Sequence, residues 1–72
     1  MENIEISTGF IKLGQLLKLS GAAQSGVHAK AMIEEGMVFV NNEKVFMRGK
    51  KIFPGDEIKL ISGESYKVTG GL

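Results

Sequence analysis

The chain has 72 residues, a formal net charge of +1 and no cysteine. This length accommodates a single domain, which we place at residues 1–72. The lack of cysteine excludes a disulfide framework, and the single histidine, His28, cannot supply the four ligands of a typical zinc site. No apolar run approaches the roughly 20 residues that span a bilayer, and the acidic N-terminus does not resemble a secretory signal. We therefore expect a cytoplasmic monomer that uses no metal and no cofactor.

The first predicted elements are a strand at residues 3–7 and a helix at residues 12–19. Isoleucines alternate with polar residues in the first segment, which is typical of a half-buried strand. In the second segment leucines recur at helical spacing and predict one apolar face of about two turns. Gly21 is suited to the left-handed conformation that commonly follows the last turn of a helix.

A second helix is predicted between Ser25 and Gly36. The Ser25 hydroxyl can accept a hydrogen bond from a free N–H group of the first turn, so it is a suitable N-cap residue. A narrow apolar stripe on this helix is formed by Ala29, Met32 and Ile33. Gly36 is expected to end the helix.

The C-terminal half of the chain is predicted to form strands. Asn41 and Asn42 can both adopt the positive φ of a two-residue hairpin turn, and a second turn is expected at residues 54–56. The expected strands are residues 38–40, 44–46, 57–61 and 65–69, followed by a flexible tail at 70–72. The predicted order is β-α-α-β-β-β-β, an α+β fold with two short helices packed on a small, mostly antiparallel sheet.

Positive charge is concentrated in two parts of the chain that contain no acidic residue. Residues 6–33 carry three of the cations and residues 44–55 carry four more, which together are seven of the nine basic residues. If the two segments meet in space, one face is strongly positive although the whole chain is nearly neutral. Alternatively, these cations only keep helices and loops soluble.

Such a face would suit a nucleic acid, because lysine and arginine contacts to phosphates supply most of the sequence-independent affinity. The free N–H groups at the start of the second helix can bind a phosphate, and Gly26 would allow a close approach, or would only relax the helix start. The planar guanidinium of Arg48 is the best single candidate for a bidentate contact. The candidate binding residues are Lys12, Ser25, Gly26, His28, Lys30, Lys44, Arg48, Lys50 and Lys51.

Enzymatic constellations are largely missing. Ser25 and His28 lie three residues apart, but a nucleophile and base would need a third group and an oxyanion site. Ser25 is better explained as a cap and His28 as a surface residue of the first turn. The aromatic residues are expected to be buried in the core, with exposed stacking platforms for bases as the alternative; they are Phe10, Phe39, Phe46, Phe53 and Tyr66.

Several runs of this chain together resemble the alpha-L RNA-binding domain of ribosomal protein S4. The runs are KLGQLL at residues 12–17, Ser25 with AK at 29–30 and Ile33, GxVxVN at 36–41 and PGDxI at 54–58. The similarity covers roughly residues 10–60, and the stand-alone bacterial versions of the domain are the most similar. It implies a non-catalytic protein that docks on structured RNA, usually ribosomal, through the two helices and the adjoining loop.

The resemblance also assigns positions to individual residues. Lys12 occupies the usual cation position at the start of the first helix, and Lys30 stands where the family commonly has arginine or lysine. Many members have arginine directly after the serine, where this chain has Gly26. The missing cation would mean either weaker RNA binding or a transfer of its role to Arg48, Lys50 and Lys51. A different class of function remains open, a protein–protein adaptor associated with the ribosome or with a replication or repair complex.

Overall fold

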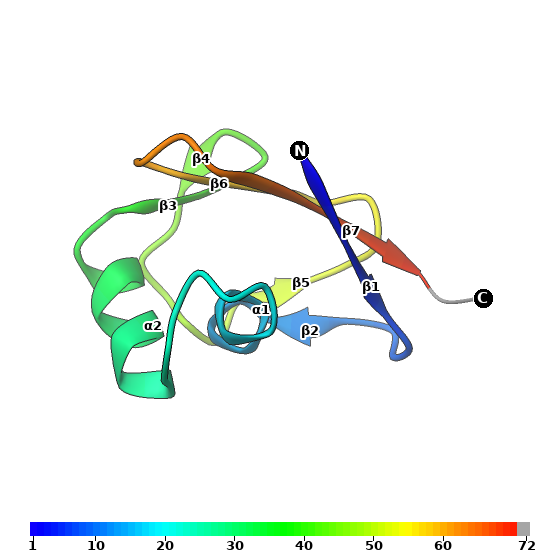
Figure 1. Ribbon diagram of the computed structural model, residues 1–72, viewed down its shortest axis with the longest axis horizontal. Coiled ribbons are helices and arrows are strands. Elements are labelled where there is room, and N and C mark those ends of the chain that lie inside the picture. The colour runs from blue at the N-terminus through cyan, green and yellow to red at the C-terminus, as the bar shows by residue number, and fades with distance from the viewer. Residues whose placement is uncertain (71–72) are drawn as a thin grey trace.

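The computed structural model describes residues 1–70, which fold into two helices on one face of a five-stranded sheet (Figure 1). The first half of the chain contains β1 (Glu2–Ile6), β2 (Ile11–Lys12), α1 (Leu13–Leu19) and α2 (Gly26–Glu34). The second half contains β3 (Val38–Val40), β4 (Glu43–Lys44), β5 (Lys51–Ile52), β6 (Glu57–Leu60) and β7 (Ser65–Gly70). The predicted α+β class is confirmed.

The main sheet has the strand order β1-β7-β6-β3-β4. The pairs β7–β6, β6–β3 and β3–β4 are antiparallel, whereas β1 lies parallel to β7 with Ile4 opposite Val68. The first and last strands of the domain therefore lie side by side. The predicted, mostly antiparallel sheet is confirmed, with one parallel pair at its edge.

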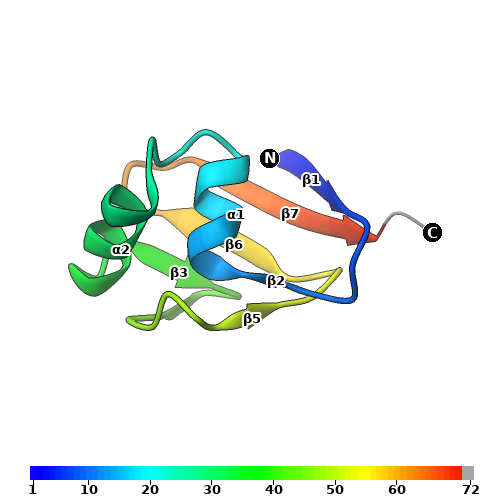
Figure 2. The same ribbon diagram turned by 90° about the horizontal axis from the view of Figure 1, so that it is seen from below.

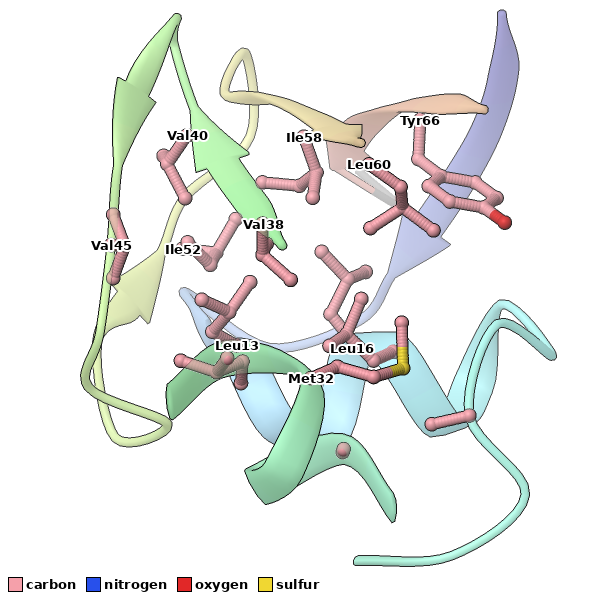
Figure 3. Close-up of a cluster of buried hydrophobic side chains, with 14 of the residues drawn as sticks. Leu13, Leu16, Met32, Val38, Val40, Val45, Ile52, Ile58, Leu60 and Tyr66 are labelled. Atoms are coloured by element: carbon pink, nitrogen blue, oxygen red, sulfur yellow. The ribbon is translucent and has the colours of Figure 1, made fainter. Parts of the chain in front are cut away.

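The core lies between the sheet and the helices, where the aliphatic side chains of both layers meet (Figure 3). The leucines at positions 13, 16 and 17 and Ile33 are fully buried, as the helical spacing predicted. The sheet contributes its inward-facing residues, among them Val38, Ile58 and Val68. Because strand side chains alternate between faces, the intervening residues of β6 and β7 point away from the helices.

The local signals at the ends of elements act as predicted. The Ser25 hydroxyl accepts a hydrogen bond from the His28 N–H at 3.1 Å and caps α2. Gly36 has a φ of 75° after the end of α2, and such a left-handed residue is a common stop for a helix. Asn41 and Asn42 have φ values of 51° and 70°, which confirms the hairpin turn between β3 and β4.

The structure differs from the prediction in several details, and the bounds of β1, α1 and β6 each differ from the predicted ones by one residue. A second, two-stranded sheet of β2 and β5 was not predicted, because two-residue strands show no periodicity. The strand that returns from the asparagine turn is Glu43–Lys44, not residues 44–46, although the Val45 N–H still donates to the carbonyl of Val38 at 3.1 Å. Gly70 belongs to β7 and not to a flexible tail; residues 71 and 72 of that tail lie outside the described residues.

Candidate nucleic-acid interface

The basic loop before β5 is fixed to the start of α1 by backbone hydrogen bonds. The N–H groups of Leu13 and Gly14 donate to the carbonyls of Lys50 and Arg48 at 2.9 and 3.0 Å. The N–H groups of a first helical turn have no acceptor within their own helix, so the loop caps α1 from outside. Next to these bonds, β2 pairs with β5, and Figure 2 shows the two strands side by side at the start of α1. The two acid-free segments of the sequence therefore meet in space.

A cleft of about 310 Å³ lies where α1, α2 and this loop come together. Three cations from different parts of the chain line the cleft, namely Lys12, Lys18 and Arg48. Gly26, the first residue of α2, also lines it and brings the positive end of that helix dipole to the cleft. The remaining lining residues are Gly14, Gln15 and Gly49, so no lining residue is acidic. This arrangement suits an anion such as a phosphate.

The structure brings only part of the predicted set into the cleft. Lys12, Gly26 and Arg48 line it, and Lys51 lies beside it as the strand partner of Lys12. Lys50 is exposed in the same loop, and its carbonyl accepts the hydrogen bond from α1. Positive charge thus extends from the cleft along residues 48–51.

The other predicted cations lie outside the cleft. Lys30 is exposed on α2 but does not line it. The Lys44 Nζ lies 5.7 Å from the centre of the Phe39 ring, and its aliphatic stem would contact a side chain introduced at Gly36. Lys44 is therefore held on β4, at the edge of the main sheet.

Ser25 and His28 have local roles at the start of α2. Beyond the cap bond already described, the His28 Nδ1 accepts a hydrogen bond from the Gln24 N–H at 3.1 Å. The two side chains thus satisfy backbone donors before and inside the first turn. Both side chains therefore help to position the start of α2.

The sequence-based set missed Lys18, the third cation of the cleft. Lys18 follows Gly14 by one helical turn and lies on the face of α1 opposite the buried leucines. Gln15 was also missed; its Oε1 accepts a hydrogen bond from the Lys12 N–H at 3.3 Å. The sequence contained a signal for Lys18, because positions i and i+4 of a helix share one face and Lys18 follows Gly14 by four residues.

The prediction that the aromatic residues are buried is wrong for three of the five. Tyr66 is buried and Phe39 is half-buried, but Phe10, Phe46 and Phe53 are 38%, 56% and 48% exposed. The reason is that aliphatic residues of the helices and the main sheet already fill the core. Phe10 and Phe53 adjoin the β2–β5 sheet, and their ring centres are 6.0 Å apart.

Two negative findings apply to residues 1–70. In this part of the chain no helix is long and apolar enough to cross a membrane. The same residues contain no group of three or more histidine, cysteine, aspartate or glutamate side chains that could hold a metal ion.

Comparison of the sequence with known proteins identifies the family of this chain. The model of the S4 domain matches residues 4–69, which is most of the chain and includes every residue that lines the cleft. The chain belongs to the S4 domain family. This S4 domain is 42% identical over 66 residues to the probable ribosome maturation protein RlbA of Bacillus subtilis (strain 168). The match covers 92% of the chain and 93% of that relative.

The S4 domain has room for a side chain at Gly26. A Cβ atom added there would meet no other atom within 4 Å, and Gly26 does not have a positive φ. The glycine is therefore not required by the backbone or by packing. A side chain at position 26 would therefore extend the lining of the cleft.

Proposed function

We propose that this S4 domain is a non-catalytic RNA-binding module that docks on structured, ribosome-related RNA in the bacterial cytoplasm. The observation that carries the proposal is the convergence of Lys12, Lys18 and Arg48 at the N-terminus of α2. Membership of the S4 family supports RNA as the ligand. The similarity to a protein named for ribosome maturation supports a ribosome-related target.

The proposed mechanism is electrostatic docking of the RNA backbone. A phosphate in the cleft would be contacted by the cations of α1 and of the loop, while a neighbouring phosphate would be contacted by residues 50–51. The N–H groups of Gly26 and Val27 belong to the first turn of α2 and have no acceptor within the helix, so they can donate to the same phosphate. The ligand would thereby release counterions, which is the main source of non-specific affinity for nucleic acids.

The dimensions of the helices favour RNA over reading of a DNA major groove. The helices contain 7 and 9 residues, and the cleft lies between them and a loop rather than along one helix. A recognition helix for DNA lies in the major groove and presents several side chains to base edges. A short, rigid basic face is better suited to the backbone and shape of a structured RNA.

A titration against salt tests this proposal. We expect an RNA hairpin of about 20 base pairs to bind with a log–log salt slope between about −3 and −5, since four to six phosphate contacts contribute roughly 0.7–0.9 each. A DNA hairpin of the same sequence serves as the control and is expected to bind more weakly. A slope near zero, or a preference for DNA, would contradict the proposed docking.

Restoring the family's cation in the cleft should strengthen binding. Gly26→Arg adds a cation at a lining residue of the cleft, where an added Cβ atom meets no other atom within 4 Å, so we expect the affinity for the RNA hairpin to rise several-fold. The salt slope should become steeper by roughly 0.7–0.9, the effect of one more phosphate contact. Gly26→Ala is the control, because it changes helix propensity but not charge. An unchanged slope in Gly26→Arg would show that phosphates do not enter the cleft.

A further inference from the structure

An apolar hollow lies beside the basic cleft, between α1 and the segment of residues 8–11 that precedes it. The hollow is shallow and largely open to solvent, with a volume of about 750 Å³. The residues that line it are Thr8, Phe10, Ile11, Gln15, Lys18 and Leu19. Two of them, Gln15 and Lys18, also line the basic cleft. The hollow and the cleft therefore share a wall.

Phe10 gives the hollow an exposed aromatic surface. Its ring is inclined by 47° to the ring of Phe53, and the Lys51 Nζ lies 4.9 Å from its centre. This cation–π contact keeps a positive charge at the edge of an apolar surface. Leu19, which is 58% exposed, contributes further apolar surface to the hollow. Exposed apolar surface and cations therefore lie next to each other at this place.

Polar groups are present at defined places around the hollow. The Thr8 hydroxyl donates a hydrogen bond to the carbonyl of Phe10 at 2.7 Å, which leaves its oxygen able to accept. Gln15 accepts the Lys12 N–H through Oε1, so its amide hydrogens can still donate. A ligand with a flat ring and a polar edge could form hydrogen bonds with the Thr8 hydroxyl and the Gln15 amide.

We propose that the hollow receives one unpaired base of the RNA whose backbone lies in the basic cleft. The inference rests on the proposed function and extends it by naming the RNA element, a bulged or looped nucleotide next to a paired stem. A nucleotide joins a flat ring to a phosphate, and here an aromatic hollow adjoins a cationic cleft. The lining residues include Lys18 and no acid, and Lys51 lies against the Phe10 ring, so the charge of the surface complements a polyanion. Bases of single-stranded segments commonly stack on aromatic side chains.

The test compares two RNA hairpins that differ only in a single bulged nucleotide. The wild-type domain should bind the bulged hairpin roughly 10-fold or more tightly, because stacking of one base on an aromatic ring has an effect of this size. A fluorescent adenine analogue at the bulge should change its emission on binding. Phe10→Ala should remove both the preference and the emission change, while the fully paired hairpin keeps its affinity and salt slope.

Two further variants distinguish loss of the aromatic ring from a general effect on folding. Phe10→Leu keeps an apolar side chain but removes the ring, and it should also lose most of the preference. Phe46→Ala removes another exposed aromatic that does not line the hollow, and it should bind both hairpins as the wild type does. Equal wild-type affinities for the two hairpins, or a preference that persists in Phe10→Ala, would overturn the inference. Absence of salt-dependent binding to either hairpin would instead contradict the proposed function itself.

Discussion

Replacement of two cleft cations, in the variant Lys18→Ala/Arg48→Ala, is expected to weaken binding of the RNA hairpin roughly 100-fold at low salt. Each hydrogen bond to a charged group contributes about 1.5–3 kcal/mol, and a factor of ten in affinity corresponds to about 1.4 kcal/mol. The log–log salt slope should become shallower by about 1.5–2, since two phosphate contacts are lost. Both side chains are exposed, so the fold should be retained. Fluorescence anisotropy titrations at several salt concentrations measure both quantities.

A matched control removes the same charge from the other side of the molecule. Lys59 and Lys67 are exposed on β6 and β7, and their neighbours Ile58 and Val68 point into the core. The two lysines therefore point away from the helices. Lys59→Ala/Lys67→Ala should change the affinity by less than about threefold, the effect of long-range charge alone. Equal losses in the two double variants would mean that net charge, and not the cleft, governs binding.

The variant Lys18→Ala/Arg48→Ala, together with nuclease treatment, also separates the two classes of function considered from the sequence, an RNA-binding module and a protein–protein adaptor. An adaptor that binds a protein through apolar surface should keep its partner in Lys18→Ala/Arg48→Ala and after nuclease treatment. An RNA-binding module should lose its association with ribosomal particles in both cases. Co-sedimentation of the tagged domain with ribosomal particles, with and without nuclease, makes this comparison.

Leu17→Ala is expected to have the largest effect on stability. Leu17 is fully buried on the inner face of α1, and removal of a buried leucine side chain typically costs about 2–5 kcal/mol through lost burial and the cavity left behind. A domain of this size has a total stability of roughly 4–11 kcal/mol. The variant should therefore unfold at a much lower urea concentration, as followed by circular dichroism.

Leu19→Ala provides the comparison within the same helix. Leu19 is 58% exposed, and leucine and alanine have similar helix propensities, so the free energy of unfolding should change by no more than about 0.5 kcal/mol. A similar loss of stability in the two variants would show that burial of the inner leucines is not what holds α1 on the sheet.

Local features of this fold were readable from the sequence because they depend on neighbours within a few residues. Ser25 caps α2 through a bond to an N–H three residues later, and Gly36 and the Asn41–Asn42 pair adopt the positive φ values that their side chains tolerate. The helical spacing of leucines identified the buried face of α1. Each of these signals arises from the period of a helix or from the φ preference of a single residue.

Part of the candidate site was readable in the same way. The acid-free segments pointed to Lys12 and Arg48, and both line the cleft. Lys30 and Lys44 carried the same signal but lie elsewhere, since a charge pattern along the chain does not say which way a side chain faces. Lys18 was missed although its helix face was predictable from the leucines.

By itself, the sequence determined the α+β class, the two helices, the N-cap of α2, the aliphatic core and the presence of two basic, acid-free segments. Only the tertiary structure decided that these segments meet, through hydrogen bonds from Leu13 and Gly14 to the carbonyls of Lys50 and Arg48. It also decided that β1 pairs with β7, and that Phe10 and Phe53 remain partly exposed beside the β2–β5 sheet. The physical reason is that backbone bonds between distant residues depend on no side-chain pattern, while burial depends on which residues have already filled the core.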